Sequence, residues 1–209
     1  NVPLSNEAAY RITSIQPTRG LYQTAYSAKR NAVFATSAVG RPPVRQSELL
    51  RLNADTLAVE ARVTPAAAPG RTGRDGQPQD GGVFAVYGVG VDDANDTVWV
   101  SNSRQNTVAV YRQSDLSLVR QFEPGTVNHA RDVVIDEEHG KAYASATFEP
   151  EVVVFDTAAL TVAKRIKIDT TVRGETFSAA SVSYDREARR LYVASNSTNE
   201  VAVIDAAAD

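Results

Sequence analysis

The chain alternates short apolar runs with polar turns, and one arrangement of these runs occurs four times. The clearest copies are VYGVGVDDANDTVWVSN at 86–102, ARDVVIDEEHGKAYASA at 130–146 and AASVSYDREARRLYVAS at 179–195. A more divergent copy, LYQTAYSAKRNAVFATS, occupies 21–37. The runs alternate or are rich in β-branched residues, and none has a 3.6-residue period, so the pattern predicts strands rather than helices.

Each copy predicts four strands. A small apolar strand and a polar turn lead to an alternating strand such as TVWVSN at 97–102. A β-branched run such as EVVVF at 151–155 follows, and then a more polar outer strand such as LTVAKRI at 160–166. Four strands in about 40 to 50 residues are typical of a β-propeller blade. A β-sandwich is the alternative, although it would not require the same four-strand unit each time.

The sequence therefore predicts an all-β fold, a β-propeller of four-stranded antiparallel blades within a single domain spanning 1–209. About four blades are expected, at 21–64, 86–124, 130–168 and 179–209, and the last is incomplete because it stops before its outer strand. The insertion at 65–82 is dominated by Gly, Pro, Ala and charged residues, and it is predicted to be a flexible loop.

Residues 10–16, YRITSIQ, resemble an outer strand that has no inner strands before it. We expect this segment to close a blade whose other strands follow residue 209, so that the sequence is part of a chain of roughly 300 residues or more. If the sequence were instead the entire protein, it would have to associate to cover its open blade faces.

The stretch YDREARRLYVASNSTNEVAVID at 184–205 resembles the YVTN type, the surface-layer-associated β-propeller repeat. The stretch RGLYQTAYSAKRNAVFATS at 19–37 is similar to the opening blade of YncE-like proteins, which are exported seven-bladed bacterial propellers. The resemblance implies a seven-bladed propeller that is secreted, periplasmic or associated with the cell envelope, and it carries over no catalytic set. The chain departs from the repeat at Ser27, Tyr111 and Arg112, where the family usually has Asp, Ile and Asp.

Charge and composition argue against several classes of function. A net charge of -3 gives no electrostatic footprint for nucleic acid or an acidic membrane surface. The absence of Cys excludes disulfides, thiolate metal sites and a Cys nucleophile. No apolar run approaches 18 residues, so no membrane span is expected. The chain begins at Asn1 and has no Met, which we interpret as a removed N-terminus; a cleaved signal peptide would account for it.

Inserted loops at 40–47, 64–82 and 169–178 are expected on one face, around the mouth of the central channel. The first residues of each inner strand should line that mouth, and they give the candidate ligand-binding residues Tyr22, Tyr87, His129, Arg131 and Asp132. Arg131 could hold a carboxylate or phosphate in a bidentate fork between the two Tyr walls. The alternative is a water-filled mouth in which Arg131 pairs with a neighbouring blade.

These observations favour a non-catalytic binding or scaffold protein that acts through the loop-rich channel face. The expected partner is a protein, a cell-envelope polymer or a small anionic ligand, and no catalytic residues, metal or cofactor are expected. One alternative is a lactonase-like or oxidoreductase enzyme with its site in the channel. Another is single-stranded nucleic-acid binding by Tyr22, Tyr87 and the loop arginines, which the acidic residues on the same face disfavour.

Overall fold

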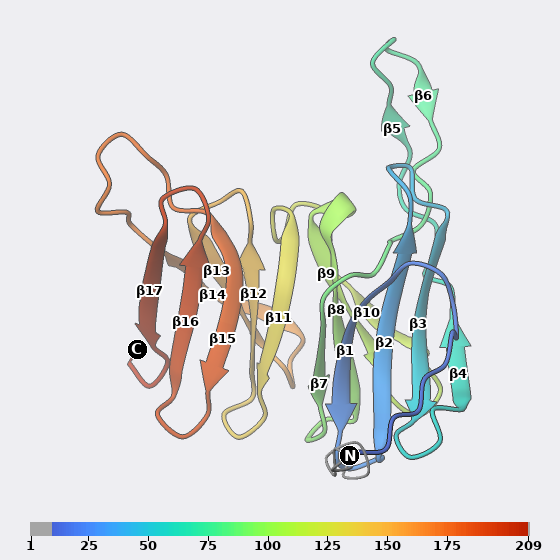
Figure 1. The fold of residues 1–209 in the computed structure, drawn as a ribbon. Coiled ribbons are helices and arrows are strands. Elements are labelled where there is room, and N and C mark those ends of the chain that lie inside the picture. The colour runs from blue at the N-terminus through green and yellow to red at the C-terminus, as the bar shows by residue number, and fades with distance from the viewer. Residues whose placement is uncertain (1–9, 209) are drawn as a thin grey trace, which may run out of the picture.

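The computed structural model describes residues 10–208, where every regular element except one 3-10 helix is a β-strand (Figure 1). Four antiparallel sheets stand side by side, one from each sequence repeat, and we call them blades 1 to 4. Blade 1 contains β1 (Leu21–Ser27), β2 (Ala32–Val39), β3 (Gln46–Asn53) and β4 (Val59–Val63). Blade 2 contains β7 (Val89–Asp92), β8 (Thr97–Asn102), η1 (Ser103–Gln105), β9 (Thr107–Arg112) and β10 (Leu118–Gln121).

Blade 3 contains β11 (Ala130–Asp136), β12 (Lys141–Ala146), β13 (Glu151–Asp156) and β14 (Thr161–Lys167). Blade 4 contains β15 (Ala179–Asp185), β16 (Arg190–Ser195) and β17 (Glu200–Asp205). The predicted all-β architecture of four-stranded antiparallel sheets is thus confirmed, with blade 4 three-stranded among the described residues. Within 10–208 no helix is long and apolar enough to cross a membrane.

The inner strands β1, β7, β11 and β15 are neighbours, and together they line what we call the channel face. The turn after each inner strand depends on one side-chain oxygen. Asp92, Asp136 and Asp185 each accept backbone N–H groups of the turn at 3.0 to 3.2 Å. In blade 1 the Ser27 hydroxyl accepts the Arg30 N–H at 3.2 Å, so Ser27 replaces the recurring Asp without loss of the turn bond.

Apolar side chains fill the space between consecutive blades. Trp99 is fully buried, with its ring centroid 6.0 Å from that of Phe122 and 5.4 Å from that of Phe155, and this cluster joins blades 2 and 3. Truncation of such an aromatic side chain typically costs about 3–5 kcal/mol. Trp99 is therefore a core residue of the contact between these two blades.

The long connections emerge from one end of the blades, the upper end in Figure 1, which we call the loop-rich face. The insertion predicted as a flexible loop carries a short hairpin there, formed by β5 (Arg71–Thr72) and β6 (Pro78–Gln79). The loop between β14 and β15 projects from the same end (Figure 1). The opposite end has the short turns, so the predicted one-sided placement of the loops agrees with the structure.

Two apolar features remain exposed. Residues 10–16 form no strand among the described residues, and Tyr10 and Ile12 are more than 80% exposed, so their role as a closing strand stays a prediction. In β17, the last strand of blade 4, Val201 is 68% exposed and Val203 is 59% exposed. These two valines lie on the face of blade 4 that is turned away from blade 3, since Ala202 and Ile204 pack toward blade 3.

Hydrogen bonds also tie blade 2 to blade 1 and blade 3 to blade 2. The Thr36 hydroxyl of β2 donates to the Tyr87 carbonyl of blade 2. The equivalent Ser101 of β8 donates to the Arg131 carbonyl of blade 3 at 2.8 Å and accepts the Gly88 N–H at 2.8 Å. A Cβ at Gly88 would lie 2.0 Å from the Arg131 carbonyl oxygen, so glycine is needed for this approach of two backbones.

Gly88→Ala should therefore push blades 2 and 3 apart. We expect the free energy of unfolding to fall by about 3 kcal/mol, the upper part of the usual range for overpacking, as measured by urea denaturation. Gly70→Ala is the matched control, because Gly70 is exposed and its added Cβ would lie 3.3 Å from the nearest atom. Equal stability of the two variants would contradict this account of Gly88.

A second link joins blades 3 and 4 at the turn end. The Asp136 side chain, 4% exposed, accepts the Tyr184 hydroxyl at 2.8 Å and lies 3.0 Å from His139 Nδ1. Burial acts to raise the pKa of Asp136, but the hydrogen bonds from Tyr184 and His139 outweigh it, and the pKa lies below its ordinary 3.8. The ionised carboxylate is therefore the form that stabilises the folded chain.

This stabilisation should be complete above the ordinary Asp pKa and lost as the pH falls through the lowered value. We expect Asp136→Asn to reduce the free energy of unfolding by about 2 kcal/mol at pH 7, the scale of hydrogen bonds to a charged group. The deficit should shrink below pH 4, as measured by denaturation across pH. Asp185→Asn is the control, since Asp185 is exposed and caps only its own turn. A deficit that is the same at pH 7 and below pH 4 would refute the linkage.

Candidate functional site

The predicted aromatic residues meet at the loop-rich end of the channel face. Tyr22 at the start of β1 and Tyr87 just before β7 have ring centroids 5.4 Å apart and interplanar angle 88°, an edge-to-face contact. Tyr22 is 48% exposed, whereas the Tyr87 hydroxyl is buried without a hydrogen-bond partner among the described residues. The two rings therefore pack on each other, and Tyr22 is the one that offers surface to a ligand.

His129 and Arg131 lie beside this pair, at the start of β11. The His129 ring packs on Phe148, with centroids 4.4 Å apart and a tilt of 33°, and Phe148 is 66% exposed. The backbone at His129 is left-handed, with φ 46°, and its N–H donates to Asn106 Oδ1 at 2.8 Å. This bond places the imidazole next to η1, which carries Arg104.

Arg104, His129, Arg131 and Phe148 form what we call the cationic cluster. Burial, and then the positive charges of Arg104 and Arg131, lower the pKa of His129 below 6.5, so the ring is neutral at pH 7. Both arginines are exposed, and neither forms an ion pair with a described residue. The cluster thus presents two guanidinium groups, an imidazole and an aromatic ring to solvent.

Asp132 has a different role from its neighbour. Its Oδ2 accepts the Val182 N–H of blade 4 at 2.9 Å, and its own N–H donates to Ser145 at 3.0 Å. Gln23 at the equivalent position of blade 1 makes the same kind of bond, to the Val89 N–H at 2.7 Å. Asp132 therefore serves the contact between blades, and its predicted contact with a ligand stays a prediction.

Sequence reasoning missed Arg104 and Phe148. Neither stands on an inner strand, and they lie 25 and 19 residues from His129 in the sequence. Arg104 and Phe148 come close to His129 because of the turn conformations at η1 and after β12. Such turns produce no periodic pattern in the sequence. Within 10–208 no group of three or more His, Asp or Glu side chains is placed to hold a metal ion.

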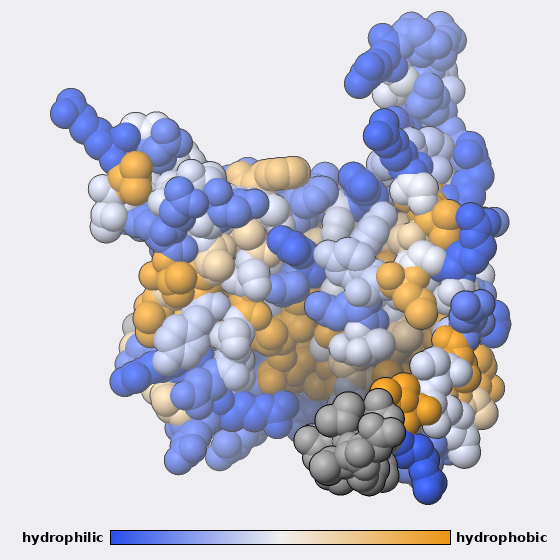
Figure 2. Space-filling model, in the orientation of Figure 1, coloured by the Kyte–Doolittle hydropathy of each residue, from blue (hydrophilic) through white to orange (hydrophobic). Residues whose placement is uncertain are grey.

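The channel face also contains a hollow below this cluster. It has a volume of about 370 Å³ and is lined by inner-strand residues such as Gly90, Val134 and Val182. Figure 2 shows apolar side chains exposed in the middle of this face, with polar side chains above them. The face is therefore polar at the loop-rich end and apolar along the strands.

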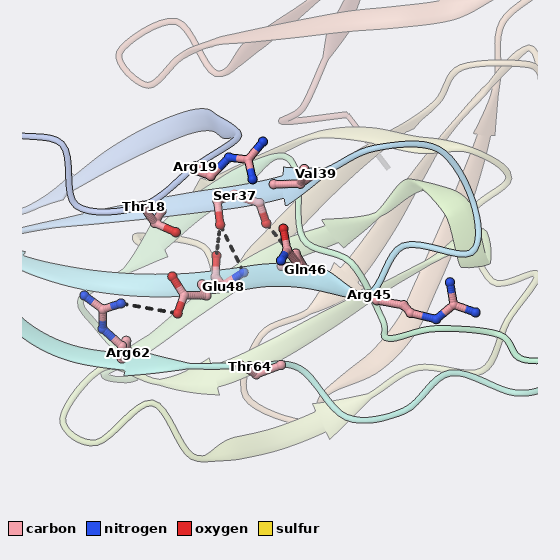
Figure 3. A pocket seen from close by; sticks show the side chains of 10 residues that line it. Thr18, Arg19, Ser37, Val39, Arg45, Gln46, Glu48, Arg62 and Thr64 are labelled. Atoms are coloured by element: carbon pink, nitrogen blue, oxygen red, sulfur yellow. Dashed lines mark hydrogen bonds and ion pairs between the residues drawn. The ribbon is translucent and has the colours of Figure 1, made fainter.

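A further cavity of about 320 Å³ lies in blade 1 (Figure 3). Thr18 and Arg19, from the segment before β1, meet Ser37 of β2, Glu48 of β3 and Arg62 of β4 there. Sequence reasoning did not identify this cavity, because strand pairing alone brings these positions together.

Comparison with known proteins gives the fold. No protein-family model matches the chain, and no curated protein matches it. Among solved structures, Kuenenia stuttgartiensis hydrazine synthase matches with a TM-score of 0.67 and 15% identity, over 93% of this chain and 50% of that chain. The structure of a nidogen/laminin complex matches with a TM-score of 0.57 and 11% identity, over 90% of this chain and 61% of that chain.

The β-propeller domain of Myceliophteria thermophila Cps50 (Swd1) also matches, with a TM-score of 0.58 and 11% identity, over 88% of this chain and 50% of that chain. This chain thus spans between half and about three-fifths of the length of these three structures. At such identities the likeness concerns the fold alone, and it is the likeness of a β-propeller.

Proposed function

We propose that this chain belongs to a non-catalytic β-propeller binding protein, which holds a carboxylate or phosphate group of its partner at the loop-rich face. The cationic cluster carries the proposal. Two arginines without ion-pair partners among the described residues can each take an oxyanion in a bidentate fork. The neutral His129 adds one hydrogen bond, and Phe148 adds an exposed apolar surface.

The propeller supports a site of this kind because the cluster rests on hydrogen-bonded backbone. The His129 carbonyl accepts the Thr147 N–H at 3.3 Å, and the Asn128 amide donates to Glu149 at 3.0 Å. These bonds hold the residues that flank His129 and Phe148. A cluster on rigid elements loses little conformational entropy when it binds.

The finer features of the proposal come from the sequence resemblance. YVTN-type repeats support a seven-bladed protein outside the cytoplasm, secreted, periplasmic or held at the cell envelope. The exposed Val201 and Val203 are consistent with a further blade next to blade 4. A scaffold that binds an acidic protein or an anionic envelope polymer would use the cationic cluster in the same way.

A labelled hexaglutamate peptide tests the cationic cluster, with inorganic phosphate as competitor. We expect Arg104→Gln combined with Arg131→Gln to weaken peptide binding at least tenfold in fluorescence anisotropy, because both oxyanion forks are lost. Binding should strengthen as the pH falls through the lowered pKa of His129, since the ring then gains charge, and His129→Gln should remove this pH dependence.

Arg173→Gln combined with Arg190→Gln is the matched control, because it removes the same charge from blade 4 and the loop before it. Less than threefold weakening is expected from this control. Equal losses in the two double variants would indicate unspecific charge attraction and overturn the proposal. Tighter binding of a single-stranded oligonucleotide than of the peptide would overturn it in favour of nucleic-acid recognition.

A further inference from the structure

A small pocket lies on the loop-rich face, where connections of blades 1 and 2 meet. It has a volume of about 220 Å³ and is bounded by the insertion that carries β5 and β6, by η1 and by the loop after β10. Its walls are connections at the end of the blades. They do not belong to the strand faces against which a further blade would pack.

Hydrogen bonds hold these walls together. The Gln105 amide donates to the Val83 carbonyl at 3.1 Å and so ties η1 to the base of the insertion. The Asn106 carbonyl accepts the Gly125 N–H at 2.8 Å and the Val127 N–H at 3.1 Å, which ties the loop after β10 to the end of η1. The pocket is therefore part of the folded loops, and a ligand would lose little conformational entropy in shaping it.

The insertion wall is held in the same way. The Ala68 N–H donates to the Gly82 carbonyl at 2.9 Å, and a Cβ at Gly81 would lie 1.9 Å from the Pro69 carbonyl oxygen. The two limbs of the insertion are thus in close backbone contact just before Arg71, the first residue of β5. This contact fixes the backbone from which the Arg71 side chain extends.

Two arginines from different walls supply the charge of the pocket. Arg71 stands in β5 and Arg104 in η1, both are exposed, and neither forms an ion pair with a described residue. The lining residues, all within 10–208, include no Asp or Glu. Asp80 and Glu123 flank lining residues without lining the pocket, and Asp80 is already paired with Arg45 at 3.4 Å. A ligand can therefore reach two guanidinium groups whose charge no lining carboxylate offsets.

The rest of the lining includes three proline rings, those of Pro42, Pro69 and Pro124. An arginine holds a carboxylate in a bidentate fork, so two arginines match a ligand with two carboxylates. The proline rings offer apolar contact to the carbon chain between them, which a compact oxyanion such as phosphate lacks. The volume is below the usual range of ligand pockets, about 300–1,000 Å³, so the carbon chain must be short.

We propose that this pocket binds a small dicarboxylate such as succinate, with one carboxylate on Arg71 and the other on Arg104. Arg104 is shared with the cationic cluster, whereas Arg71 belongs to the pocket alone and Arg131 to the cluster alone. The dicarboxylate site does not rest on the proposed partner, so either proposal can fail without the other.

Isothermal titration calorimetry of the chain with succinate, at physiological ionic strength, tests this site. Succinate should bind, and its monoamide, succinamate, should bind at least tenfold more weakly because it has lost one carboxylate. Arg71→Gln should weaken succinate binding at least tenfold. Arg74→Gln is the matched control and should weaken it less than threefold, because Arg74 is an exposed arginine of the same hairpin that does not line the pocket.

Arg131→Gln separates this site from the cationic cluster, and it should leave succinate binding within threefold. If succinate binding depends on Arg71 while the hexaglutamate peptide fails to bind, only the proposed function is refuted. The dicarboxylate proposal is overturned if succinate does not bind the unaltered chain, or if Arg71→Gln binds it as tightly as Arg74→Gln. Equal losses in Arg71→Gln and Arg131→Gln would also overturn it, and so would tighter binding of succinamate or inorganic phosphate than of succinate.

Discussion

The structure depends on how the inner strands satisfy the backbone groups that their own sheets leave unpaired. An inner strand has one edge without a neighbouring strand, and buried N–H and C=O groups on that edge need partners. Side chains of the preceding blade supply them: Gln23 accepts the Val89 N–H, and Asp132 accepts the Val182 N–H. Between blades 2 and 3, Ser101 joins the Gly88 N–H to the Arg131 carbonyl. These bonds lie beside the aromatic and aliphatic cores that pack between the same blades.

The same constraint explains which polar residues of the channel mouth remain available. A carboxylate at the third position of an inner strand lies opposite an N–H of the next blade. The Asp132 carboxylate is therefore engaged in the hydrogen bond to blade 4. The side chain of the second position points outward, and at Arg131 only the carbonyl is engaged. The polarity of the mouth is therefore carried by Arg131 together with His129 and Arg104.

Much of the fold could be predicted from the sequence, because strands and turns depend on residues that are close together along the chain. The alternation of TVWVSN predicted β8, and the repeated four-strand unit predicted the antiparallel sheets. The sites could not be predicted to the same extent. The blade 1 cavity is lined by Glu48, Arg19 and Arg62, which strand pairing and the path of the segment before β1 bring together. These residues do not stand at positions that recur in the repeat. Arg104 approaches His129 through a left-handed turn, which residue patterns do not encode.

The cationic cluster and the blade 1 cavity each lie directly beside a bond that ties two blades together. Arg131 precedes Asp132, whose carboxylate is bound to blade 4, and Glu48 follows Ser47, whose hydroxyl is bound to Val86 of blade 2. Because side chains alternate along a strand, one residue of each pair can fix the backbone while the side chain of its neighbour points to the other face of the sheet. At the cationic cluster, Arg131 thus has a backbone held on two sides, which limits the entropy lost on binding. In a propeller of this kind, the exposed residue of such a pair can be substituted while the contact between blades is kept, because the neighbouring residue makes that contact.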